Sequence, residues 1–272
     1  MKKMFLSLTL IAAVTLVFTA CKKDADTTQA SAPQQNQEIS PETLSQIKQL
    51  GFGTSSVKKL DKDHYLVEND IVLTREQLNS KPKAEFIRVG DEEQYRTTNT
   101  VLGLPRTVTI RVSTALPWAF FVAADSAIRR YNSLGLLLRF ARVTVGGEIV
   151  INPAPSGSPY LASAGFPNDY GNPYSQVLVN TSYLNSWPLQ TKTSVLAHEL
   201  GHCIGFRHTD YANRAYSCGG TAVNEGATTF GAKWIPGTPV GADPNSWMLA
   251  CIGYGVNRPF NANDRIALNW LY

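Results

Sequence analysis

Three of the four histidines in the chain lie in one short segment, H-E-x-x-H-x-x-G-x-x-H, from His198 to His208. On a helix, His198 and His202 share one face, so both can bind a single metal ion. Glu199 projects beside that ion, where a general base for a metal-bound water belongs. Gly205 can end the helix with a sharp turn and return His208 as a third ligand. Three histidines leave a fourth position on Zn²⁺ open for water, which is typical of catalytic zinc sites.

The segment has the motif of the metzincin zinc peptidases, and the intact Glu199 argues against a degenerate member without turnover. Their second signature, a methionine turn, is matched by Met248 in residues 246–250. Within that clan, residues 198–210, 218–220 and 243–251 resemble the bacterial protease-B-like, or dual-action HEIGH, metallopeptidases. The resemblance covers roughly residues 95–272. The chain departs from the pattern in Leu200 instead of isoleucine, in Ala250 where some metzincins have a tyrosine ligand, and in the bulky Trp247.

The resemblance implies an α+β fold with a twisted, mostly parallel sheet, a helix that carries the active site and a loop-rich C-terminal subdomain. It also implies a zinc-dependent endopeptidase, in which Glu199 activates a zinc-bound water and Met248 packs beneath the metal without binding it. An edge strand near residues 160–164 would line the cleft. A protein or peptide substrate in extended conformation would then bind there by β-augmentation.

The first residues have the pattern of an export signal. Lys2 and Lys3 precede an apolar run that is short for a membrane span, so residues 1–20 are predicted to be a signal peptide. Cys21 follows a small residue, as in a bacterial lipoprotein, and would be lipidated; plain secretion is the alternative. Residues 21–39 are polar and indicate a flexible tether. We therefore expect an exported bacterial lipoprotein of the cell envelope or surface that meets the membrane only through its lipid anchor.

Residues 40–96 are predicted to be a small module preceding the catalytic domain, as pro-segments do. A helix is expected to begin at Ser40-Pro41, residues 65–73 have the character of a strand, and a short helix is expected to follow from Thr74. Residues 68–71 are similar to the latency motif of astacin pro-segments, where an aspartate binds the open position on zinc. By that resemblance Asp70 would keep the enzyme latent as a zymogen; the alternative is an ordinary exposed carboxylate at the end of a strand. Cleavage within residues 81–106 would release the mature enzyme.

Residues 97–272 are predicted to be the catalytic domain. Strands are expected over residues 107–112, 136–143, 148–151 and 176–179, and helices over 117–131, from 188 or 189 through the zinc motif, and over 261–272. Trp118, Phe121 and Tyr131 are among the residues of the expected apolar face of the helix over 117–131. Residues 153–173 are rich in loop-forming residues. Ca²⁺ ligands in that loop are one interpretation, and ordinary loop-solvating side chains are the other: Asn168, Asp169 and Asn172.

The cysteines beyond Cys21 are Cys203, Cys218 and Cys251. A disulfide is permitted in an exported protein, and we expect Cys218 to pair with Cys251, with the pair Cys203–Cys251 as the alternative. Tyr216 and Tyr254 are candidates for stabilising an oxyanion by residue type only.

The charge of the chain gives no sign of a nucleic-acid partner. The formal net charge is +4, and no basic stripe with interleaved aromatic residues occurs. We expect a monomer. Two other functions stay open: a surface lipoprotein that binds a protein or glycan with zinc as a structural element, and an enzyme acting on a non-peptide amide or ester. The sequence does not reveal the subsite specificity, the physiological substrate, the processing site or the membrane face.

Overall fold

The computed structural model describes residues 38–50, 52–79, 94–225, 232–239 and 241–272. By its internal contacts the chain divides into residues 1–35 and 36–272, and all described residues belong to the second unit. The predicted signal peptide, Cys21 and most of the tether lie outside the described residues. Within the described part, no helix has both the length and the apolar character needed to cross a bilayer.

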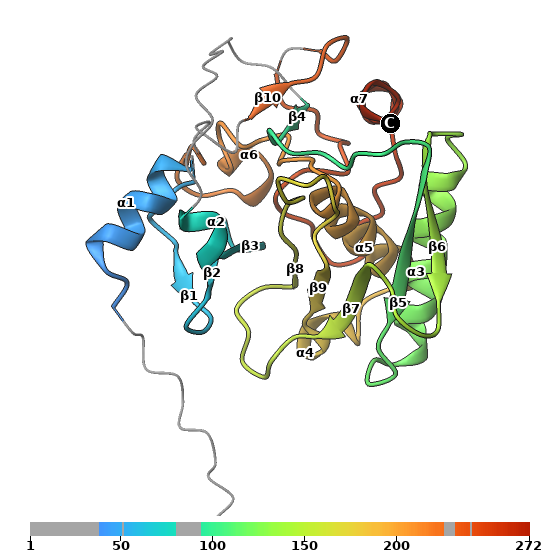
Figure 1. Cartoon of the computed structure of the whole chain (residues 1–272), viewed down its shortest axis with the longest axis horizontal. Helices are drawn as coiled ribbons and strands as arrows, with labels where there is room; N and C mark the ends of the chain where they lie inside the picture. Colours follow the sequence, from blue (N-terminus) through green and yellow to red (C-terminus); the bar gives the residue numbers. More distant parts are fainter. Residues whose placement is uncertain (1–37, 51, 80–93, 226–231, 240) are drawn as a thin grey trace, which may run out of the picture. The chain divides into compact units, whose positions relative to one another are not determined.

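A five-stranded sheet forms the centre of the catalytic region (Figure 1). Its strands are β5 (Arg106–Val112), β6 (Leu138–Val143), β7 (Ile149–Pro153), β8 (Ala162–Ser163) and β9 (Gln176–Val179), in the order β6-β5-β7-β9-β8. The first four are parallel, and β8 pairs antiparallel with β9 at one edge. The mostly parallel sheet and the expected edge strand near residues 160–164 are thus confirmed.

Two long helices, α3 (Trp118–Asn132) and α5 (Leu189–Cys203), pack against each other beside the sheet. Tyr131 of α3 donates a hydrogen bond to the main-chain oxygen of Ala197 in α5 at 2.7 Å. The expected apolar face of α3 is only partly correct, because Trp118 is 72% exposed whereas Ala123 and Ala127 are fully buried. Small alanines let the two helices approach closely. The apolar face was predicted partly wrongly because it was assigned from the large aromatic residues at the start of α3.

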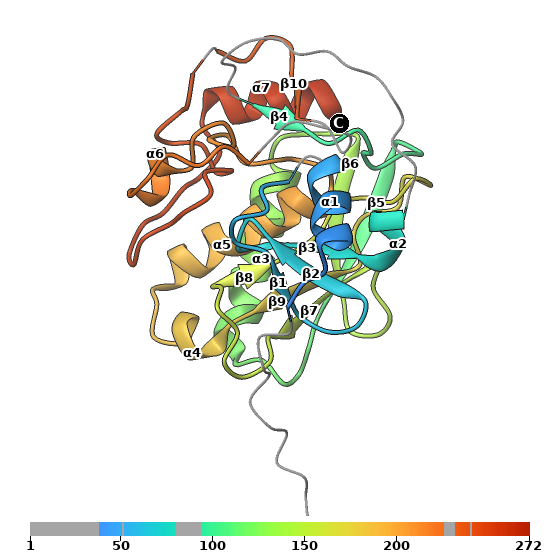
Figure 2. The same cartoon turned by 90° about the vertical axis from the view of Figure 1, so that its left-hand side faces the viewer.

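The N-terminal module contains α1 (Pro41–Gln49), α2 (Arg75–Asn79) and a three-stranded antiparallel sheet, which faces the viewer in Figure 2. The strands are β1 (Lys58–Lys59), β2 (His64–Val67) and β3 (Ile71–Thr74). The prediction of one strand over residues 65–73 is wrong, because Glu68 and Asn69 have positive φ angles of 54° and 67° and turn the chain back. A tight hairpin, with residues 68–70 at its tip, therefore replaces the expected strand.

The hairpin continues the central sheet beyond β8. Val72 donates to the main-chain oxygen of Ala164 at 2.7 Å, and Ala164 donates to that of Asp70 at 2.9 Å. Leu66 and Val72 of the hairpin share an apolar cluster with Tyr160. The module and the catalytic region are thus joined by main-chain pairing and by a buried apolar contact.

The rest of the catalytic region consists mainly of loops with short elements. These are β4 (Tyr95–Arg96), paired with β10 (Lys233–Trp234), and the helices α4 (Thr181–Leu184), α6 (Ala215–Cys218) and α7 (Ala262–Leu271). The last helix begins with a capping box made by Asn261 and Asp264. Strand β4 lies on the N-terminal side of the predicted domain boundary at residue 96, yet it pairs with a strand of the catalytic region.

Candidate active site

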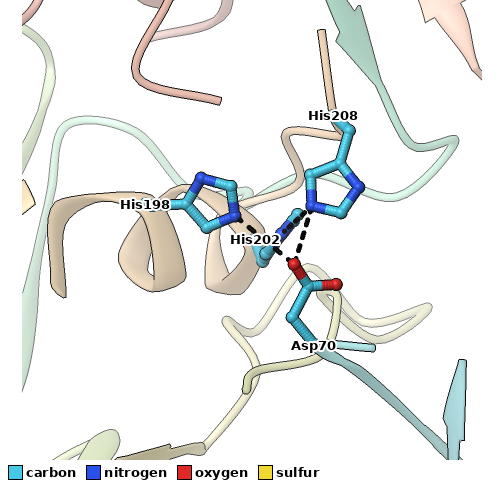
Figure 3. A group of neighbouring side chains, drawn as sticks. All are labelled: Asp70, His198, His202 and His208. Atoms are coloured by element: carbon cyan, nitrogen blue, oxygen red, sulfur yellow. Dashed lines mark hydrogen bonds and ion pairs between the residues drawn. The ribbon is translucent and has the colours of Figure 1, made fainter. Parts of the chain in front are cut away.

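Helix α5 carries the first two histidines, and a glycine turn returns the third. Gly205 has a φ of 110°, and a Cβ atom there would lie 2.9 Å from the main-chain oxygen of Asn99, so glycine is required for both conformation and space. The side chains of His198, His202 and His208 converge as the sequence predicted (Figure 3).

The converging atoms form a compact set of possible metal ligands. The Nε2 atoms of His202 and His208 are 3.2 Å apart. Asp70 Oδ2 lies 3.0 Å from His208 Nε2 and 3.8 Å from His198 Nε2. One ligand atom from each of these four buried residues lies within 4.8 Å of the others. Three imidazoles and a carboxylate oxygen are a donor set that suits Zn²⁺.

Each histidine is held by a hydrogen bond through its outer ring nitrogen. His198 Nδ1 lies 2.9 Å from the main-chain oxygen of Trp247, and His202 Nδ1 lies 2.8 Å from that of Phe206. His208 Nδ1 lies 3.0 and 3.1 Å from the two carboxylate oxygens of Glu225. Because carbonyl and carboxylate oxygens only accept hydrogen bonds, each Nδ1 donates, and Nε2 is the ring nitrogen directed at the position where a metal would lie.

Glu199 lies beside this set without a fixed partner. Its side chain is buried and lines a cavity of about 320 Å³ together with His198 and Asp70. Among the described residues, none is within hydrogen-bonding distance of Glu199 Oε2. Burial raises the pKa of the Glu199 carboxyl well above its usual range, and the charge of Asp70 raises it further. A carboxyl group that lines the cavity, has a raised pKa and has one oxygen without a hydrogen-bond partner among the described residues is suited to accept a proton.

The methionine turn packs against helix α5. A Cβ atom on Gly201 would lie 2.6 Å from Met248 Sδ, so the glycine inside the zinc motif makes room for the methionine. The main-chain oxygen of Met248 accepts a hydrogen bond from Thr209 at 2.9 Å, next to the third histidine. The bulky Trp247 is buried and donates from Nε1 to Tyr131 Oη at 3.3 Å. Met248 thus packs against the helix that carries the first two histidines.

Asp70 reaches the histidines from the tip of the module's hairpin (Figure 3). Burial alone would raise the pKa of its carboxyl, but the charge of His208 and hydrogen bonds from His198 and His208 outweigh burial and lower the pKa. The aspartate is therefore a buried carboxylate directed at the position where a metal would lie, and not an exposed one at the end of a strand.

A group of buried charges surrounds the third histidine, and the sequence gave no indication of it. Arg207 Nη2 donates to Glu68 at 2.9 and 3.1 Å, and Arg214 Nε lies 3.1 Å from Glu225 Oε1. Glu225 accepts from both an arginine and His208, and so orients that ligand. Glu225 follows His208 in an irregular loop, where no periodic pattern could have revealed the pairing.

The remaining predicted residues lie around this centre. Cys218 and Cys251 are joined by a disulfide, which ties α6 to the chain after the methionine turn, and Cys203 is free and buried. Tyr216 and Tyr254 are exposed and do not line the cavity, so neither is placed to stabilise an oxyanion.

The side-chain oxygens of the loop proposed to bind calcium accept hydrogen bonds from other groups of the protein. Asn168 Oδ1 accepts from the main chain of Tyr170 and Asn172, and Asp169 Oδ1 accepts from the Asn99 side chain. Arg106 donates to Asn172 Oδ1 at 3.1 Å, and its positive charge opposes a cation there. This arrangement favours the interpretation of loop-solvating side chains.

Comparisons with known proteins agree with the motif and its geometry. A family model described as dual-action HEIGH metallo-peptidase matches residues 65–272, and so includes the hairpin as well as the catalytic region. A solved structure titled "Structure of myroilysin" matches with 14% identity and a TM-score of 0.43, covering 65% of this chain and 95% of that one. A likeness this low carries no argument about the site. No curated protein matches the sequence significantly.

Proposed function

We propose that this chain, which belongs to the dual-action HEIGH metallopeptidase family, is a zinc-dependent endopeptidase in which Glu199 is the general base. The proposal rests on the convergence of the Nε2 atoms of three histidines, whose Nδ1 atoms each make a hydrogen bond. Beside them lies Glu199, one of whose carboxylate oxygens has no hydrogen-bond partner among the described residues. His198, His202 and His208 would hold the metal.

Bound zinc supplies a Lewis acid that acidifies water and polarises the scissile carbonyl. Glu199 takes a proton from the attacking water and later gives it to the leaving amine. Burial supports the first step, because a raised pKa makes the Glu199 carboxylate a stronger base. The hydrogen bonds that the three imidazoles donate to the main-chain oxygens of Trp247 and Phe206 and to the Glu225 carboxylate keep them in the orientation that binding requires.

The module would hold the enzyme latent in two ways. The carboxylate of Asp70 lies beside the histidines and would compete with water for a metal held by them, as expected for a zymogen. Residues 70–72 also pair with Ala164 beside the edge strand β8, where an extended substrate would add to the sheet. Release of the hairpin would free the metal and the edge together.

Export remains part of the proposal, with Cys21 as the lipid attachment site of a monomeric envelope protein. The export signal is read from the sequence alone, since residues 1–37 lie outside the described part.

The test compares the full-length chain with its Glu199→Gln variant, each loaded with zinc and incubated with an unfolded protein. Mass spectrometry should show cleavage of that protein, or of the chain itself upstream of residue 107, only when Glu199 is present. The variant keeps the size of the side chain and removes the base. If neither protein cleaves anything while both hold zinc, latency or the alternative of a surface protein with structural zinc is favoured, and cleavage by Asp70→Ala decides between the two.

A further inference from the structure

A buried ion pair links the module to the catalytic region next to the metal site. Arg207 directly precedes the ligand His208 and is fully buried, and one of its nitrogens donates to both carboxylate oxygens of Glu68. Glu68 lies at the tip of the same hairpin that carries Asp70. The module also covers the guanidinium, since the ring of Phe52 lies 4.8 Å from Arg207 Cζ. The hairpin thus inserts two carboxylates side by side.

A second arginine holds the same residue by its main chain. Arg214 Nη1 donates to the carbonyl oxygen of Glu68, and Arg214 lines the cavity with His198 and Glu199. On the catalytic side, the carboxylate of Glu225 lies 3.8 Å from Arg207 and 3.1 Å from Arg214 and also bonds His208, and Asp210 adds its charge near Arg214. Displacement of the hairpin removes the Glu68 carboxylate that accepts from Arg207, so this part of the cleft loses one negative charge beside two arginines.

We propose that Arg207 and Arg214 form a carboxylate-binding subsite, which Glu68 fills in the latent chain and an acidic side chain of the substrate fills in the active enzyme. A buried arginine that loses its carboxylate partner is destabilising, so a ligand that restores the pair gains affinity. Glu68 is two residues from Asp70, so the acidic residue of the substrate lies within about three residues of the scissile bond. This inference rests on the proposed peptidase function for the identity of its ligand.

The first test uses a small carboxylate as a probe and needs no turnover. In the full-length, zinc-loaded chain, Glu68→Ala opens space beside Arg207. Propionate can enter this space and pair with the guanidinium, whereas its neutral isostere propionamide can form no ion pair there. Propionate in excess of its dissociation constant should raise the Tm of the variant by about 3 °C more than propionamide does. The wild-type chain, whose subsite is filled, should show no such difference.

The matched control is Glu148→Ala, which removes the carboxylate from the partly exposed pair with Arg106. Water can solvate that arginine, so propionate should have no advantage over propionamide there. An equal response of both variants, or no difference between the two probes, overturns the subsite. If Glu68→Ala does not fold, Glu68→Gly opens the same space and suits the positive φ of 54° at this position, and the same difference between the two probes is expected.

The second test measures substrate choice in the active enzyme. Matched peptides with Glu or Gln at each position near the cleavage site should differ about tenfold in kcat/KM at one position only. Arg214→Gln should bring this ratio toward one, and a wild-type ratio near one at every position contradicts the proposal. A chain that cleaves neither peptide refutes the peptidase function, and the propionate result still decides whether the subsite exists.

Discussion

Asp264 is predicted to make the stability of the protein fall as the pH rises. Its carboxylate is fully buried where the methionine turn meets α7, and it accepts hydrogen bonds from the main chain of Asn261 at 3.0 Å and Trp247 at 3.3 Å. The Gln94 side chain donates to its other oxygen at 2.8 Å. Burial outweighs these hydrogen bonds and raises the pKa of the Asp264 carboxyl from 3.8 to about 7.

The sign and size of the effect follow from proton linkage. Between those two pKa values the folded protein keeps a proton that the unfolded chain has released, so folding binds a proton and stability decreases with pH. A pKa that moves from 3.8 to about 7 corresponds to about 4 kcal/mol of stability, lost as the pH rises through that range.

Asp264→Asn should remove this dependence at little structural cost. The asparagine oxygen can keep the main-chain hydrogen bonds. Its amide can donate to Gln94 Oε1, which has no partner among the described residues, once the Gln94 amide turns over.

Unfolding measured at about pH 4 and about pH 8 checks the argument. The two proteins should have similar stability at the lower pH, which serves as the internal control. At the higher pH the variant should gain several kcal/mol relative to the wild type, or a Tm difference of roughly 10 °C. A difference between the proteins that does not change with pH would refute the reasoning.

Two further variants test the support of the metal site. Glu225→Gln weakens the hydrogen bond that orients His208, so zinc affinity in competition with a chelator should fall by about 10- to 100-fold, and unchanged affinity would remove Glu225 from the site. Gly201→Ala places a methyl group against Met248 and should destabilise the protein by about 1–3 kcal/mol in denaturant unfolding. Gly253→Ala is its control, because a Cβ atom there meets only an ordinary contact at 3.6 Å and should change stability little.

The convergence of the three histidines proposed as metal ligands could be predicted because their geometry is encoded locally. His202 follows His198 at position i+4 of a helix, and Gly205 marks the point after the helix where the chain turns. The spacing alone therefore placed three nitrogens together, and the family model agrees with the class of enzyme that they indicate.

The partners of those ligands could not be predicted, because they come from distant segments. Nothing in the loop after His208 marks Glu225 as its partner, and nothing in the module marks Glu68 as the partner of Arg207. The hairpin was missed although a signal was present: Asn69 and Asp70 are turn-forming residues within an otherwise apolar run. Asp70 could be identified from the sequence only because residues 68–71 resemble a latency motif.

The central claim is best tested by removing Asp70, the proposed latency residue, first alone and then together with Glu199, the proposed general base. The rate of cleavage of an unfolded protein is measured for the full-length, zinc-loaded wild type, Asp70→Ala, and the double variant Asp70→Ala/Glu199→Gln. Asp70→Ala should cleave faster than the unprocessed wild type, and the double variant should be inactive while binding zinc. Equal rates for the wild type and Asp70→Ala would contradict latency through Asp70, and an active double variant would contradict the role of Glu199.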